Sequence, residues 1–212
     1  MKAVKNNLLG TIFAGVVASV MSISVEAATV PTKITTFTNV LTTDVFSVKA
    51  KGWSDPAFGD MGWTHSSAWG IFTATKGQTV SIILKADDKG IHPGSTIWYR
   101  GDNDTAPDQY VVDHFYPQNA NFAKFAAVTE DTGEKLGNIV MKYVTHAYDL
   151  DNNSISDLTL KGRKDGVAGR LNISFKAPYT GTYMFVVGGF NPDTNITDLK
   201  ASYNVNVQVT VK

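Results

Sequence analysis

The sequence contains no cysteine, so it has neither disulfides nor a thiolate that could act as a ligand or nucleophile. It also lacks an excess of charge of either sign, because 19 Lys and Arg residues balance 19 Asp and Glu residues. That balance gives no electrostatic footprint for nucleic acid or for an anionic membrane. These absences exclude nucleic-acid binding proteins, disulfide-stapled scaffolds and cysteine-dependent catalysts.

The common catalytic motifs are missing as well. The sequence has no Gly-x-Ser-x-Gly elbow, no His-Glu-x-x-His pair and no glycine-rich phosphate loop. Acidic residues are frequent, but no particular pair stands out as the acid and base of a hydrolase. We therefore expect a protein that binds a ligand and is not an enzyme, with an uncharacterised secreted hydrolase as a third-ranked alternative.

Residues 1–27 have the composition of a secretory signal peptide. Lys2 and Lys5 form a positive start, residues 8–20 are apolar but too few to span a membrane, and residues 25–27 suit a signal peptidase. Cleavage after Ala27 would leave residues 28–212, which fit one domain. We expect an exported protein.

The chain after residue 27 is typical of many short strands. It is rich in β-branched and aromatic residues, and Gly, Asn and Asp interrupt it at short intervals. The clearest strand is 203–211, where Tyr203 and four valines alternate with polar residues. Further strands are expected at 79–84, 139–143, 169–175 and 182–187, turns at 92–94 and 178–181, and one or two helical turns within 119–128.

No linker or internal repeat divides the chain. We therefore predict an all-β fold, a single antiparallel β-sandwich of jelly-roll type with few short helices. Residues 175–187 resemble the end of the jelly-roll modules that are appended to bacterial secreted enzymes. That resemblance concerns the fold alone and carries no activity.

Residues 61–65, Met-Gly-Trp-Thr-His, form the most informative local motif. In an extended strand, alternate residues share a face, so Met61, Trp63 and His65 would lie side by side. A thioether beside an imidazole suits soft metals, above all Cu(I). The alternative interpretation is an aromatic strand face with one polar residue at its edge.

The sequence has only four histidines, His65, His92, His114 and His146. His114 lies in an aromatic-rich stretch beside Asp113, and His92 precedes Pro93-Gly94. Either could be a second metal ligand, whereas His146 is expected to be structural. Zinc is a weak prediction, because two histidines without a third strong ligand make a poor tetrahedral site.

Residues 149–157 suggest a separate calcium site. Asp149, Asp151, Asn153 and Asp157 place carboxylate and amide oxygens at alternate positions of this stretch, and such oxygens bind Ca²⁺. The stretch lacks the Gly and the distal Glu of an EF-hand loop. An Asx-rich turn is therefore the alternative interpretation.

Several of these features together resemble a known family. The Trp63-x-His65 motif, a second distant histidine, the export signal and the lack of cysteine are similar to the copper-repressible, surface-associated copper(I)-binding proteins of methane-oxidising bacteria, the MopE/CorA family. The resemblance implies Cu(I) as the ligand, held by His65, His114 and a Trp63 that has been oxidised to kynurenine. It also implies a secreted protein or one associated with the outer-membrane surface, with surface proteins as partners.

The chemistry behind this implied site is coherent. An intact indole offers only an N–H donor, whereas kynurenine carries an aromatic amine that can bind a metal. Surrounding the site with Trp69, Phe115 and Tyr116 would exclude water and favour the lower oxidation state of copper. The second-ranked interpretation is a non-catalytic, carbohydrate-binding β-sandwich whose exposed Trp and Tyr rings stack on sugars.

Overall fold

The computed structural model describes residues 28–29, 34–50, 67–112, 119–129, 132–152, 161–191 and 201–212. Every regular element in these ranges is a strand, and none of their residues forms a helix that could cross a membrane. The strands are β1 (Ala28–Thr29), β2 (Ile34–Thr36), β3 (Thr43–Lys49), β4 (Ala68–Ala74), β5 (Thr79–Ala86), β6 (His92–Arg100), β7 (Val111–Val112), β8 (Phe122–Val128), β9 (Lys135–Asp149), β10 (Gly162–Arg163), β11 (Arg170–Lys176), β12 (Gly181–Phe190) and β13 (Ser202–Val211).

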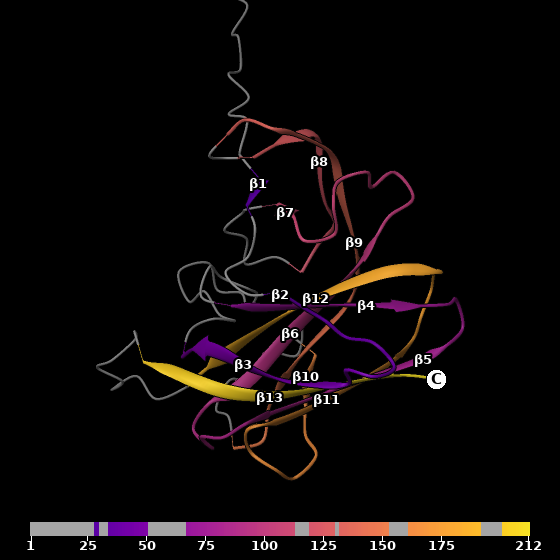
Figure 1. The fold of residues 1–212 in the computed structure, drawn as a ribbon. Helices are drawn as coiled ribbons and strands as arrows, with labels where there is room; N and C mark the ends of the chain where they lie inside the picture. The colour runs from indigo at the N-terminus through magenta and orange to yellow at the C-terminus, as the bar shows by residue number, and fades with distance from the viewer. Residues whose placement is uncertain are drawn as a thin grey trace, which may run out of the picture.

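Two main sheets make up the fold (Figure 1). The large sheet has the order β10-β9-β6-β12-β4-β2, and β8 also pairs with β9. The small sheet has the order β11-β5-β13-β3. Neighbouring strands are antiparallel except in the pairs β2–β4 and β10–β9, which are parallel. The predicted all-β sandwich is confirmed, with these two parallel pairs at the edges of the large sheet.

The small sheet follows the alternation that the sequence predicts. In β13, Val205, Val207 and Val209 are buried, while the asparagines and the glutamine between them are exposed. This strand lies between β3 and β5, so the predicted strand at 203–211 is confirmed inside a sheet. Its apolar face packs toward the large sheet, and its polar face is open to solvent.

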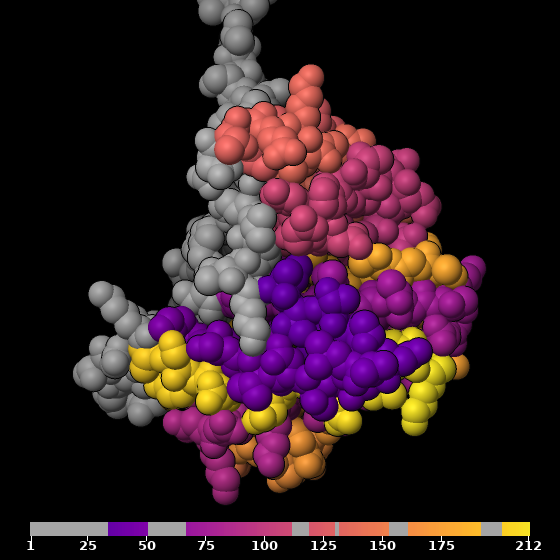
Figure 2. Space-filling model, viewed as in Figure 1, coloured from indigo at the N-terminus to yellow at the C-terminus, as the bar shows by residue number. Residues whose placement is uncertain are grey.

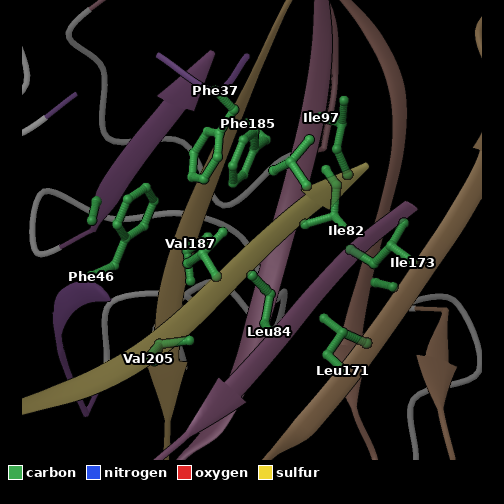
Figure 3. Packing of buried hydrophobic residues seen from close by; sticks show 14 of the residues in the cluster. Phe37, Phe46, Ile82, Leu84, Ile97, Leu171, Ile173, Phe185, Val187 and Val205 are labelled. Carbon is green, nitrogen blue, oxygen red and sulfur yellow. The ribbon is translucent and has the colours of Figure 1, made fainter. Parts of the chain in front are cut away.

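The main core fills the space between the two sheets (Figure 3). Ile82, Leu84 and Val205 of the small sheet meet Phe185 and Ile97 of the large sheet. A ring cluster extends this core toward β2, since the ring centroids of Phe37 and Phe185 are 5.7 Å apart. Each Å² of apolar surface buried between the sheets contributes about 25 cal/mol to the free energy of folding. The core between the two sheets is therefore the principal source of stability.

The large sheet is buried on both faces. All nine residues of β6 are buried, and so are the last eight residues of β12. A second apolar cluster covers the face that points away from the small sheet; it contains Trp69, Trp98, Ala106, Val111, Ala127, Leu136, Ile139, Met141, Tyr148, Met184, Val186 and Phe190. We call this side of the large sheet the outer face.

A tyrosine corner fixes the entry into β12. The hydroxyl of Tyr183 donates to the carbonyl of Tyr179 at 2.6 Å and accepts from the Tyr179 N–H at 3.0 Å. A tyrosine that binds the backbone a few residues upstream in this way is a hallmark of Greek-key sandwiches. The predicted turn at 178–181 lies within this corner, where the chain bends before β12 begins.

Two local predictions were wrong. Most of the predicted helical stretch 119–128 is strand β8, because pairing with β9 determines its conformation in spite of its helix-like apolar spacing. The predicted turn at 92–94 is instead the start of β6, where His92, Pro93 and Gly94 pair with Phe190, Gly189 and Gly188. Tertiary pairing overrode the local turn signal of Pro-Gly.

Candidate metal site

Several residues of the predicted sites lie outside the described residues. These are Met61, Trp63, His65 and His114 of the copper prediction, and Asn153 and Asp157 of the calcium prediction. The structure does describe the residues that follow the two copper segments, beginning at Ser67 and at Asn119. It also describes His92, His146, Asp149 and Asp151.

One face of the large sheet carries or contacts the described residues that follow the segments 51–66 and 113–118. Trp69 of β4 is in register with Val186 of β12, Val186 with Thr96 of β6, and Thr96 with His146 of β9. Residues in register on neighbouring strands point to the same side of a sheet. Trp69 and Val186 belong to the outer cluster, so this row lies on the outer face.

The three residues that follow the segment 113–118 are hydrogen-bonded to strands of the large sheet. The Thr96 hydroxyl donates to Asn119 Oδ1 at 2.5 Å, and Trp98 Nε1 donates to the Ala120 carbonyl at 2.9 Å. The backbone N–H of Tyr143 donates to Asn121 Oδ1 at 2.8 Å. Sequence reasoning missed these anchors, because they join residues more than 20 positions apart.

Two stacked indoles form an apolar wall beside the anchors. The ring centroids of Trp69 and Trp98 are 5.8 Å apart with an interplanar angle of 26°, and both rings are buried. The ring centroids of Trp98 and Phe122 are 6.1 Å apart. An aromatic wall of this size removes water from the adjoining surface and strengthens polar interactions there.

A pair of glycines interrupts the side chains of the outer face next to this wall. Gly94 of β6 and Gly188 of β12 are in register, and both are buried. Each lies two residues from a member of the row described above, so each has its missing side chain on the outer face. Glycine inside a strand often marks close approach by a ligand or another backbone. The signal in the sequence is the Gly188-Gly189 pair within an otherwise apolar strand.

His92 and Asp149 form a buried pair at one end of the large sheet. The Nδ1 atom of His92 lies 2.8 Å from Asp149 Oδ2, with the side chains 3% and 0% exposed. Asp149 also accepts from the backbone N–H of Gly169 at 2.6 Å and of Asp151 at 2.9 Å. The carboxylate is thus held in place by two backbone N–H donors and by the imidazole of His92.

His146 belongs to a different network. Its Nδ1 atom lies 2.6 Å from the Tyr143 hydroxyl, which accepts from Lys161 Nζ at 3.1 Å. The ring of His146 and the hydroxyl of Tyr143 are thus held together by a hydrogen bond, with Lys161 fixing the hydroxyl from the other side. This network gives His146 a bracing function between β9 and the residue that precedes β10.

The two described residues of the calcium prediction do not form a common site. Asp149 faces His92 and Gly169, whereas Asp151 Oδ2 accepts from the backbone N–H groups of Asp165 and Gly166 at 2.7 and 3.0 Å. The bond from the Asp151 N–H to Asp149 Oδ1 is an Asx turn, the alternative interpretation of this stretch. Calcium therefore has no support among the residues that the structure describes.

The backbone donors also change the acidity of Asp151. The N–H of Asp165 is the largest influence and lowers the pKa of Asp151, partial desolvation opposes it, and the N–H groups of Gly166 and Val167 lower the pKa further. The described ranges contain no group of three or more His, Cys, Asp or Glu residues arranged around one metal position.

Fold and site together define an all-β sandwich with indole and imidazole side chains along the outer face of its large sheet. A model of the copper(I)-binding protein CorA-like family matches residues 26–197, and the chain belongs to this family. No curated protein sequence matches the chain.

The solved structures that are similar to the chain include two copper-binding proteins. The surface-associated copper-binding protein CorA, important in copper acquisition by Methylomicrobium album BG8, is 32% identical with a TM-score of 0.75, and the match covers 85% of this chain and 98% of that one. The secreted protein MopE of Methylococcus capsulatus, in which an oxidised tryptophan facilitates copper binding, is 17% identical with a TM-score of 0.57, covering 85% and 99%. The second similarity shows the fold alone. The resemblance predicted from the Trp-x-His motif is confirmed.

Proposed function

We propose that this chain is an exported, non-catalytic protein that binds Cu(I) as its cargo, for copper acquisition or storage. The ligands in this proposal are His65, His114 and Trp63 after its oxidation to kynurenine. Family membership is the observation that carries the proposal. The surface association and secretion of the two similar proteins, together with the signal-like residues 1–27, support a position at the outer-membrane surface or outside the cell.

The described anchors permit the two histidines to meet over the outer face. His65 is four residues from Trp69, and His114 is five residues from Asn119. An extended residue spans at most about 3.6 Å, so these tethers reach roughly 14 and 18 Å. Trp69 and Thr96, which binds Asn119, are separated by two strand spacings, or about 10 Å.

The surroundings also suit the lower oxidation state of copper. Cu(I) is satisfied by few ligands, and imidazole nitrogen suits copper well. The Trp69–Trp98 wall provides an apolar boundary next to the anchors. A hydrophobic shell of this kind limits the access of water and thereby influences the redox potential of a metal.

The test compares copper content after replacement of single histidines. We expect His65→Ala and His114→Ala each to abolish stoichiometric Cu(I) binding, because the loss of one of two main ligands leaves the ion nearly uncoordinated. His146→Ala is the matched control, and it should keep its copper because Nδ1 of this ring is already engaged by the Tyr143 hydroxyl, which also accepts from Lys161. Protein from the native host should show the mass of kynurenine in the peptide that contains Trp63.

The proposal would be overturned by one pair of results. These are native protein with an intact tryptophan at position 63 and full copper binding after His65→Ala. Protein from another host with an unmodified Trp63 is expected to bind copper poorly, since the indole lacks a lone pair for the metal.

The carbohydrate alternative has one observation in its favour. The Tyr179 ring is 42% exposed and stacks on Tyr99 at 4.6 Å, with Lys142 Nζ 5.4 Å from its centroid. In the described part of the chain, Phe125 is the other strongly exposed aromatic ring, and it lies on β8. A single tyrosine offers a much smaller sugar platform than a row of rings, so copper binding is the better-supported function.

A further inference from the structure

We propose that the turn at residues 38–41 and the groove beside it form a self-complementary surface on which a second copy of this chain docks. In a two-fold symmetric pair, the turn of each copy enters the groove of the other. This inference goes beyond copper binding, and none of the residues that carry it belongs to the proposed copper site.

The groove exists because the chain crosses from one sheet to the other before two of the strands have ended. In the large sheet, β2 pairs with β4 only as far as Ile71, whereas β4 continues to Ala74. In the small sheet, the register of β3 with β13 ends at Gln208, whereas β13 continues to Val211. On this side, the ends of β4 and β13 therefore have no neighbouring strand among the described residues. Such open edges are places where another chain can attach.

A groove of about 460 Å³ lies at these open strand ends, and we call it the edge groove. In Figure 2, residues 34–50, in indigo, lie open on the viewed face next to β13, in yellow. A concave site with an apolar lining and few charged groups is the usual form of a binding pocket. Besides threonines, the lining includes five apolar side chains, those of Phe37, Ile71, Phe72, Val209 and Val211.

The turn presents apolar side chains to solvent at the rim of the edge groove. Val40 is 94% exposed and Leu41 is 47% exposed, whereas Thr38 and Thr42 on either side of them line the groove. With Val45, three of the six strongly exposed large apolar side chains in the described part of the chain lie within six consecutive positions. Scattered apolar residues are common on surfaces, but a cluster beside a groove marks an interaction site.

Hydrogen bonds hold the turn in one shape. The Thr38 hydroxyl accepts from the backbone N–H groups of Val40 and Leu41 at 3.2 and 2.9 Å. The Thr38 N–H donates to the Leu41 carbonyl at 2.9 Å. A turn that is already ordered loses little conformational entropy on docking, and so the contact of its apolar side chains with a partner is not offset by ordering.

The position and charge of this surface favour a second copy as its occupant. The turn and the edge groove are adjacent, and a two-fold axis places the same patch opposite itself, so that each turn can face the partner's groove. A patch that meets itself must be free of net charge, because like charges would repel across the axis. Residues 36–43 contain no charged side chain, and the two charged residues of the groove lining, Asp108 and Lys212, balance. A strongly charged partner would find no complementary field here.

The experiment measures self-association of the full chain, processed as the host exports it. Sedimentation equilibrium over a range of concentrations gives the stoichiometry and the Kd, and we expect an equilibrium between monomer and dimer. Val40→Asp should weaken it by at least about 10-fold, because a charge replaces the apolar side chain that enters the groove. Val167→Asp is the matched control, since Val167 is also an exposed valine, at 37%, but lies outside this surface. It should leave the Kd unchanged.

A mixing experiment identifies the two halves of the contact. Thr73 lines the edge groove and is exposed, so Thr73→Arg places a long cation there and should also weaken the dimer. A mixture of Val40→Asp and Thr73→Arg chains should associate more tightly than either variant alone. In the mixed dimer one turn–groove contact is native, and the other brings the introduced carboxylate to the introduced guanidinium. Thermal melts establish that each variant is folded, and if Thr73→Arg is not, Val40→Asp against Val167→Asp decides the question.

The proposal is overturned if the wild type stays monomeric up to millimolar concentration, or if Val40→Asp associates as tightly as Val167→Asp. It is also overturned if two folded variants show no recovery on mixing, which would indicate a different surface, or if assembly continues beyond the dimer, which would indicate a head-to-tail contact. The copper function is judged separately, by the copper content of His65→Ala and His114→Ala, whatever the state of association.

Discussion

The carboxylate of Asp151 makes the molecule sensitive to acid. The folded chain lowers its pKa from the ordinary value of 3.8, mainly through the backbone N–H of Asp165. A lowered carboxyl pKa contributes stability that is fully present above the unfolded pKa, near 3.9, and is lost as the pH falls through the folded pKa. Asp151→Asn should therefore lose less unfolding free energy than the wild type between pH 5 and pH 2.5.

Urea unfolding at the two pH values measures this difference. The wild type provides the reference in the same measurement. Equal acid sensitivity of Asp151→Asn and the wild type would contradict the assignment of this bond.

At the scale of single residues, the sequence was most informative where chemistry is local. The Trp63-x-His65 motif identified the family, because the spacing of three residues is visible in the chain itself. The anchors from Thr96 and Trp98 to residues 119 and 120 could not be predicted, since only the folded sheet brings these residues together. For the same reason Asp149, read as a calcium ligand, proved to be the partner of His92.

At the scale of elements, β13 supports the fold most directly. Val207 is 1% exposed within the main core, and its neighbour Gln208 is exposed on the same strand. Val207→Asp should lower the unfolding free energy by several kcal/mol, because it buries an unpaired charge. Gln208→Asp introduces the same side chain one residue away and should change stability much less. Thermal or urea unfolding compares the two, and a Val207→Asp protein that melts like the wild type would refute the placement of this strand.

Alternation in the sequence predicted the strands that have one face exposed to solvent. β13 and β11 of the small sheet alternate between buried and exposed residues, so a period of two is visible in their sequences. β6 is buried on both faces and contains His, Pro, Gly, Ser and Thr, so it shows neither alternation nor a continuous apolar run. Its first three residues therefore had the appearance of a turn.

At the scale of the whole molecule, copper binding and folding are linked. A ligand that binds only the native state stabilises it by about 2.7 kcal/mol at a concentration 100 times its Kd. For a chain of this size, 1 kcal/mol shifts Tm by roughly 2–4 °C. Cu(I) at that excess should therefore raise Tm by about 5–10 °C at pH 7.5 in the native, modified protein.

This stabilisation should diminish as the pH falls below about 6.5, the unperturbed imidazole value, because protons compete with copper for the ligand nitrogens. Scanning calorimetry of apo and Cu(I)-loaded protein at pH 7.5 and pH 5 gives the two increments in Tm. His146→Ala should show the same increments as the wild type, since the Tyr143–Lys161 network, and not copper, engages that ring. The chain with His65→Ala and His114→Ala should lose most of the increment at pH 7.5. An increment of the same size at both pH values would mean that the groups holding copper do not titrate in this range, which imidazole ligands must do.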